Sequence, residues 1–184
     1  MEILIVIGLI VIGAFYIVSL YNTLVKKRTL AEEGYSGIDV QLKRRADLIP
    51  NLVETVKGYM EHEKGTLENI TSLRARAQSA TNPEERLKAE AGISGALANI
   101  MAVAENYPQL QASSNFISLQ GDLSAIEDQL QMARRYYNGA ARDLNILVEQ
   151  FPSNIVASHF GFEKKPFFEI ENEADRQVQK VSFK

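Results

Sequence analysis

Hydrophobic residues follow two contrasting patterns along this chain of 184 residues. The first is an unbroken apolar stretch, residues 3–20, that contains no charged side chain. The second pattern begins after residue 28, where apolar positions recur at the three-, four- and seven-residue spacings of helices that bury one face. Together they predict an all-α protein: an N-terminal transmembrane helix, then an antiparallel bundle of three long helices and one short helix, then an extended C-terminal tail.

The apolar stretch has the length of a membrane span. As a helix, residues 3–20 cover about 27 Å, close to the roughly 30 Å of a bilayer's hydrocarbon core. A cleaved signal peptide would have basic residues before the apolar run and a small-residue cleavage site after it. Here Met1-Glu2 precedes the run and no Ala-x-Ala pattern follows it. A buried core helix is disfavoured because the run is apolar on every face, so we predict a retained anchor, residues 1–28 with its flank.

Basic residues on one side of the span predict its orientation. Lys26, Lys27 and Arg28 follow the apolar stretch, whereas only Glu2 and the amino terminus precede it. Because Lys and Arg stay on the cytoplasmic side, we expect the N-terminus outside and the bulk of the chain in the cytoplasm, on the inner membrane of a bacterial cell. We expect Tyr21, Lys26, Lys27 and Arg28 to lie at the membrane interface, with the lipid bilayer as partner.

The bundle, residues 29–161, is predicted to open with a long helix between Ser36 and Ala77. Its apolar residues recur by sevens in three rows, which is the width of a core-facing helix rather than of a two-stranded coiled coil. Pro50 lies inside this register. Because the register continues across it, we expect a kink at Pro50 rather than a split at Asp47.

A capping signal marks the start of the second helix. Asn82 is placed at the N-cap, Pro83 at the first helical position and Glu85 at the third. The helix should run to about Glu105, and its many small residues should let neighbouring helices approach closely.

The third helix has the most regular pattern in the chain, and we expect Pro108 near its start. Apolar residues recur every seven positions, and a second series follows each of them by three, which predicts a continuous core-facing surface resembling a coiled coil. The first series is Phe116, Leu123, Leu130, Tyr137, Leu144 and Phe151, and the second is Leu119, Ile126, Ala133, Ala140 and Leu147.

A short fourth helix and an irregular tail complete the predicted fold. Ser153 is placed to cap a helix that reaches Phe160, with Gly161 as its stop. After Pro166 the helical period is lost, and alternating apolar residues favour an extended segment within residues 162–184. Such a tail can pack on the bundle or bind another chain. The residues that we expect to bind a partner are Phe167, Phe168, Ile170, Val181 and Phe183.

The composition limits which partners and which kinds of site the chain can have. The net charge is −3, which disfavours nucleic acid as a partner, and the absence of cysteine excludes disulfides, lipid-modified cysteines and Cys-ligated metals. His62 is followed by Glu63, as in a zinc-protease helix, but Thr66 stands where the second histidine would be required. We therefore expect a solvated His62, a partly buried His159 packed beside its neighbour, and no cofactor or metal.

A basic triplet, residues 43–45, leaves two interpretations open. It could bind lipid headgroups, but in an upright helix it lies about 25 Å beyond Lys27, outside the roughly 8–10 Å reach of membrane electrostatics. Nearby Asp39 and Asp47 favour intramolecular ion pairs instead.

Several motifs then point to a known family. The longest is YSGIDVQLKRRADLIPNLV at residues 35–53, and others are NYP at 106–108, ARRYYN at 133–138 and FFE at 167–169. The chain resembles the LemA family of bacterial membrane proteins over nearly its whole length, with Tyr35 where that family is expected to have Trp. The resemblance implies a single-pass anchor and a bundle of long helices but no defined reaction. Relatives are linked to magnetosome membrane formation, and members are often found with HtpX-type membrane metallopeptidases.

Two functional hypotheses follow. The first is a non-enzymatic, membrane-anchored helical scaffold that self-assembles into a homo-oligomer and takes part in membrane organisation or remodelling. The second is an adaptor or regulator of an HtpX-type membrane metallopeptidase, acting through the tail. An enzyme is disfavoured because no catalytic constellation is found in the sequence. Since no flexible linker follows residue 20, we also expect the anchor to continue with little break into the first helix of the bundle.

Overall fold

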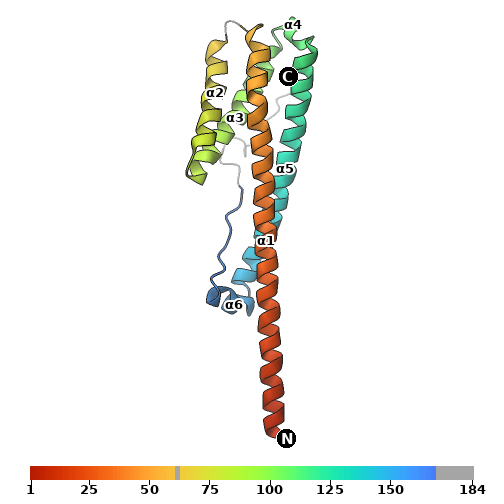
Figure 1. The fold of residues 1–184 in the computed structure, drawn as a ribbon, viewed down its shortest axis with the longest axis vertical. Helices are drawn as coiled ribbons and strands as arrows, with labels where there is room; N and C mark the ends of the chain where they lie inside the picture. Colours follow the sequence, from red (N-terminus) through yellow and green to blue (C-terminus); the bar gives the residue numbers. More distant parts are fainter. Residues whose placement is uncertain (61–62, 169–184) are drawn as a thin grey trace, which may run out of the picture. The chain divides into compact units, whose positions relative to one another are not determined.

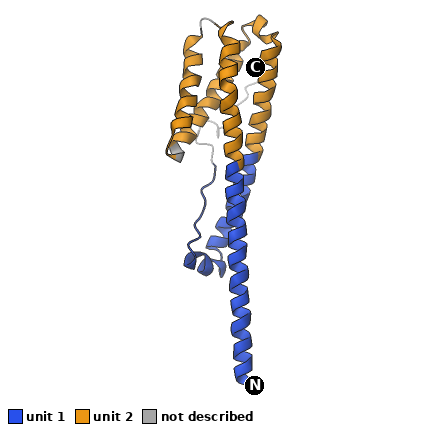
Figure 2. Cartoon of the chain, viewed as in Figure 1, with its two compact units in different colours: residues 1–36, 133–184 blue, residues 37–132 orange. Residues whose placement is uncertain are grey.

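The computed structural model describes residues 1–60 and 63–168, which form six helices and no strand (Figure 1). The all-α prediction is confirmed. The chain divides into two compact units: residues 1–36 with residues 133 onward, and residues 37–132 (Figure 2). We call these unit 1 and unit 2 and describe each by itself. The helices are α1 Glu2–Lys57, α2 Lys64–Ser79, α3 Pro83–Ala104, α4 Pro108–Gln111, α5 Ser114–Glu149 and α6 Ser153–His159.

Helix α1 confirms one expectation and corrects another. It is continuous from Glu2, so the apolar stretch does run into the first helix of the bundle without a break. The prediction that this helix reaches Ala77 was wrong, because α1 ends at Lys57. The amide of Met60 bonds to the Val56 carbonyl at 2.9 Å, and Gly58 weakens the helix where it stops. The chain then reverses into α2, so the bundle contains one more long helix than expected.

Pro50 does not split α1, as predicted, and the structure shows how the helix tolerates it. Proline has no N–H, so the Ala46 carbonyl four residues earlier loses its usual helical partner. Arg74 of α2 donates from Nε to that carbonyl oxygen at 2.8 Å. The antiparallel return of α2 therefore supplies the hydrogen bond that Pro50 removes.

Unit 2 packs four longer helical segments and the short helix α4 around one apolar core. The segments are the second half of α1, α2, α3 and the first half of α5. The cap of α3 is as predicted, since Asn82 accepts a hydrogen bond from the Glu85 amide at 3.1 Å. Small residues also act as predicted: a Cβ on Gly92 would lie 2.8 Å from the Leu73 side chain, so this glycine lets α2 and α3 approach. The buried positions of α1 here include Ile38, Leu42, Ile49, Leu52 and Val56.

The pattern of α5 is largely confirmed, with two differences at its ends. Phe116, Leu123, Leu130, Tyr137 and Leu144 are all buried at their seven-residue spacing. Phe151 was expected to continue this series but is 75% exposed. The reason is that α5 ends at Glu149, and Pro152 follows before the chain turns. At the other end, Pro108 begins the separate short helix α4.

Unit 1 consists of the first part of α1, the second part of α5, α6 and residues 162–168, which we call the strap. The α1 and α5 segments are antiparallel: Lys27 lies beside Asp143, and the Tyr35 ring lies beside the Tyr137 ring. Gly161 ends α6 with φ +69°, a left-handed conformation that glycine adopts easily, so its predicted stop is confirmed. Ser153 is the first residue of α6 rather than its cap, and His159 is exposed rather than partly buried.

Candidate functional site

The anchor is the first candidate site. Of the residues that the structure describes, only those of α1 form a helix long and apolar enough to cross a membrane. None of the apolar window is buried against the other described residues. A surface of Ile, Leu, Val and Phe this long is costly in water, because each such side chain gains about 1.5–3 kcal/mol on leaving it. The segment therefore requires an apolar environment that the described part of the chain does not supply.

Two of the four residues expected at the membrane interface, Tyr21 and Arg28, meet just beyond this segment. The Tyr21 ring packs edge-on against Phe160, with centroids 4.8 Å apart, and against Phe162 at 5.8 Å. The Arg28 guanidinium lies 5.1 Å from the centre of the Phe162 ring, a cation–π contact. Tyr21 and Arg28 are thus brought together around Phe162. Sequence reasoning did not identify either phenylalanine as part of this group.

The two lysines of the basic flank lie in different surroundings. Lys26 is exposed. Lys27 turns toward α5 and donates to an Asp143 carboxylate oxygen at 2.9 Å. This hydrogen bond, assisted by one from Arg142, holds the pKa of Asp143 below its usual range. Lys27 therefore already has an anionic partner, whereas Lys26 retains an exposed charge.

The strap is the second candidate site, and two asparagines of α5 hold it. The Asn145 side chain donates to the Lys165 carbonyl at 2.9 Å and accepts from the Lys165 amide at 2.8 Å. Asn138 makes the same pair of bonds with Phe168, at 3.0 and 2.8 Å. Seven residues of helix and three residues of extended chain both cover about 10 Å, so the two clamps are in register. These bonds reach only the backbone of the strap.

Side chains complete the contact between the strap and α5. Tyr137 donates its hydroxyl to the Pro166 carbonyl at 2.8 Å. Burial, and secondarily the neighbouring Tyr35, raises the pKa of this phenol, so it stays a donor near neutral pH. Phe168 packs with its ring 5.4 Å from the Arg134 guanidinium.

The five residues expected to bind a partner have separate outcomes. Phe168 is partly buried against α5, and Phe167 remains exposed. Ile170, Val181 and Phe183 lie outside the described residues, so their role stays a prediction.

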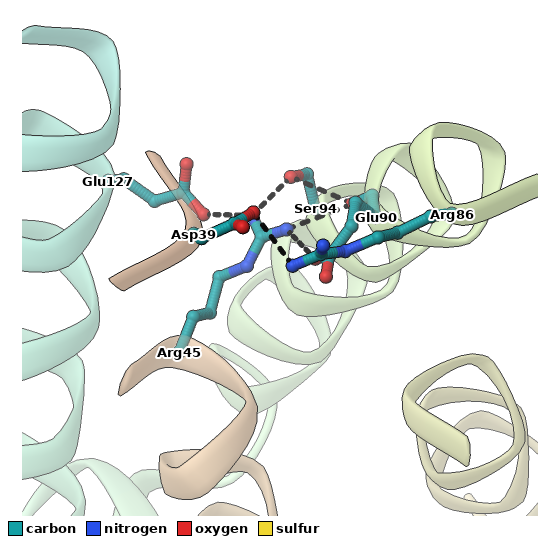
Figure 3. Close-up of polar contacts among 6 residues, drawn as sticks. All are labelled: Asp39, Arg45, Arg86, Glu90, Ser94 and Glu127. Atoms are coloured by element: carbon teal, nitrogen blue, oxygen red, sulfur yellow. Dashed lines mark hydrogen bonds and ion pairs between the residues drawn. The ribbon is translucent and has the colours of Figure 1, made fainter. Parts of the chain in front are cut away.

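Unit 2 contains a buried polar cluster that joins three helices (Figure 3). Arg45 of α1 is fully buried. Its Nη2 atom bonds to the Glu90 carboxylate at 2.6 Å and to the Glu90 backbone carbonyl at 3.1 Å, both on α3. Its Nη1 atom donates to Ser94 at 2.7 Å and also to Glu127 of α5. A buried guanidinium requires such anionic partners, because burying an unpaired charge in the core costs roughly several kcal/mol of folding free energy.

The basic triplet therefore pairs within the chain, as expected, but only partly with the expected residues. Lys43 bonds to Asp47 at 2.9 Å, one turn away on an exposed surface. Asp39 pairs with Arg86 of α3 at 3.0 Å instead of with the triplet. Glu90 and Glu127, the partners of Arg45, lie 45 and 82 residues along the chain and were missed.

Candidate metal ligands do not gather in the parts of the chain that the structure describes, where no group of three or more His, Asp or Glu is found. His62 lies outside those parts, so its predicted solvation stays a prediction.

These features define a class: an all-α protein with one helix, among its described residues, that could span a membrane, and with helices held together by a buried arginine cluster in unit 2 and by backbone clamps in unit 1. The LemA family model matches residues 34–183, and the chain belongs to that family. Protein LemA of Metamycoplasma hominis is 30% identical over 155 residues, covering 81% of this chain and 69% of the relative. Magnetosome protein MamQ 2 of Paramagnetospirillum magneticum is 25% identical over 184 residues, covering 86% of this chain and 68% of the relative.

Proposed function

We propose that this protein is a membrane-anchored helical scaffold that carries out no reaction of its own. The observation that carries the proposal is the apolar segment of α1, none of which is buried, and which continues as the same helix into the contacts with α5. A helix that continues without a joint transmits the position of the span to the helices packed on it. Membership of the LemA family and the magnetosome name of one group of relatives support a structural role.

The orientation and assembly of the scaffold are part of this proposal. Lys26 and Arg28 follow the span and are exposed, which favours the N-terminus outside and the helical units in the cytoplasm. Copies of the chain then associate in the membrane plane into a homo-oligomer that organises or remodels the bilayer. The partner-facing surfaces would be the exposed helical faces and the C-terminal tail.

Insertion and orientation can be tested with single cysteines, because the natural chain has none. We would introduce Glu2→Cys and, separately, Ser36→Cys, and treat bacterial spheroplasts with a membrane-impermeant maleimide. The proposal expects labelling of Glu2→Cys in intact spheroplasts and of Ser36→Cys only after lysis. The reverse pattern would overturn the orientation, and release of the protein by alkaline carbonate would overturn insertion.

Assembly is tested separately from insertion. The full chain would be extracted with its native lipid and its mass measured as a function of concentration. Defined oligomers are expected, and a monomer at every concentration would contradict the scaffold.

The adaptor hypothesis is kept as an alternative because Phe167, a residue of the strap, has an exposed side chain. Deleting residues 167–184 should then abolish co-purification with a membrane metallopeptidase and leave helical content unchanged. Unchanged co-purification would argue against it.

A further inference from the structure

Large apolar side chains are exposed where the chain turns from α5 into α6. We call this segment, residues 150–160, the elbow. Its exposed residues are Phe151 at 75%, Ile155 at 61% and Phe160 at 50%. The opposite side of α6 is buried, since Val156 and Ala157 pack with Leu24 and Leu144 in the core of unit 1. The elbow is therefore amphipathic: one face is fixed on the protein, and the other is exposed, with the ring contact of Phe160 to Tyr21 at its edge.

The elbow lies level with the end of the apolar span. Within unit 1, α5 runs antiparallel to α1 and Asp143 lies beside Lys27. Six residues further along α5, Glu149 therefore comes opposite about residue 21, because both helices rise by the same amount per residue. The ring contact between Phe160 and Tyr21 places α6 at that same level. Tyr21 directly follows the apolar stretch, so the exposed side chains of the elbow lie where the span would leave the hydrocarbon.

We propose that the elbow is a second membrane contact, which inserts into the interfacial layer of the leaflet from which α1 emerges. The inference rests on the proposed function, because it requires residues 3–20 to cross the bilayer. Phe151, Ile155 and Phe160 enter the boundary between headgroups and acyl chains, as the apolar faces of interfacial helices do to a depth of about 5–10 Å. The bilayer is favoured over a second copy of the chain because the elbow is continuous with the span.

The neighbouring polar groups fit this lipid layer. Tyr21 is an aromatic residue with a polar end, which is typical of membrane–water interfaces. The exposed Lys26 and the Arg28 guanidinium stacked on Phe162 lie beside the same cluster, at the depth where lipid phosphates are found. Two attachment points, the span and the elbow, fix the rotation of unit 1 about the axis of α1, which a single span leaves free.

Tryptophan fluorescence tests this placement in the full chain, which has no natural tryptophan. We would prepare Phe160→Trp and Ile155→Trp and reconstitute each into phosphatidylcholine–phosphatidylglycerol vesicles whose acyl chains carry bromine at defined depths. The emission maximum of both tryptophans should be blue-shifted relative to tryptophan in water. The emission should be quenched mainly by bromine atoms placed at shallow depth. The matched control is Tyr136→Trp, an aromatic position of α5 that is 51% exposed and lies 13 residues (149 − 136) before the end of that helix, where the elbow begins. It should keep its emission with every brominated lipid.

A variant within the span separates this inference from the proposed function. Phe15→Trp should be quenched by deep bromines if residues 3–20 cross the bilayer. If Phe15→Trp is quenched while the elbow variants match Tyr136→Trp, the second membrane contact is wrong and the anchor stands. If Phe15→Trp is not quenched, the proposed function itself fails. If brominated lipid does not quench the tryptophan emission of the elbow variants, and the emission wavelength changes with protein concentration, the surface binds a second copy of the chain instead.

Discussion

Arg74 donates a hydrogen bond from its Nε to the backbone carbonyl of Ala46, 28 residues earlier in the chain, at 2.8 Å. That carbonyl is the one that Pro50 leaves without its helical N–H partner. A long helix thus continues past an internal proline, and a side chain from the next helix replaces the missing donor. The contact also fixes the register of α2 against α1.

The coupling between these two sites can be measured. Arg74→Met should lower the free energy of unfolding by about 1–3 kcal/mol, because it leaves the Ala46 carbonyl without its partner. In a Pro50→Ala background, Arg74→Met should lower the free energy of unfolding by clearly less, because the N–H of Ala at position 50 then donates to the Ala46 carbonyl. Urea unfolding of the four proteins of this double-mutant cycle gives the coupling. Equal costs in both backgrounds would show that Arg74 does not replace the missing donor.

The buried Arg45 cluster predicts an asymmetric response to substitution. Glu90→Gln alone should destabilise unit 2 by about 3–5 kcal/mol, because it leaves a buried guanidinium short of charge compensation. Replacing Arg45, Glu90 and Glu127 together by Met, Leu and Leu should be far less damaging, since no charge is then buried without a partner. Thermal unfolding followed by circular dichroism checks both. A triple variant as unstable as Glu90→Gln would contradict this account.

The strap predicts a residue-specific change in amide exchange. Asn145→Ala should expose the Lys165 amide and Asn138→Ala the Phe168 amide, each losing protection worth about 1–3 kcal/mol for two hydrogen bonds. Hydrogen exchange read residue by residue checks this. Asn115→Ala, at an exposed asparagine in the first turn of the same helix, is the control and should leave both amides protected. Protection at Lys165 that survives Asn145→Ala would show that the clamp does not hold the strap.

Gly34 marks a close approach of α1 and α5 in unit 1. A Cβ there would lie 3.0 Å from the Cα of Tyr137 and 3.0 Å from the Tyr136 ring, so Gly34→Ala should cost about 1–3 kcal/mol. Gly139→Ala is the matched control in α5, where a Cβ meets nothing within 4 Å. It should stabilise by up to about 1 kcal/mol, as alanine favours the helix. The melting temperature should fall for Gly34→Ala and rise for Gly139→Ala. Equal shifts in the two variants would refute the close approach at Gly34.

Asp143 gives a prediction for acid. Its folded pKa is lowered, chiefly by the hydrogen bond from Lys27, so its contribution to stability is present above the unfolded value of about 3.9. That contribution is lost as the pH falls from there through the lower folded pKa. Asp143→Asn should therefore flatten the loss of unfolding free energy below about pH 4, and Lys27→Met should do the same. An unchanged acid profile in both variants would rule out this ion pair as a stabilising contact.

The sequence by itself determined most of the helical elements, because they depend on local patterns. The apolar run at residues 3–20, the cap at Asn82, the seven-residue series of α5 and the stop at Gly161 are each readable within a few turns of chain. It even contained a sign of the buried cluster: Arg45 lies three residues after Leu42 and four before Ile49, a core position. What the local pattern did not contain was which acids would meet it.

The tertiary structure decided every feature that depends on contacts between distant residues. The end of α1 at Lys57 comes with the packing of α2 into the core of unit 2, chiefly against α3, and periodicity does not reveal that packing. The asparagine clamps, the Arg74 contact and the exposed elbow likewise join residues whose spacing in sequence is set by loop lengths. The period of the apolar residues predicts which face of a helix is buried, but it does not predict which helix covers that face. The partner is determined only when the helices pack.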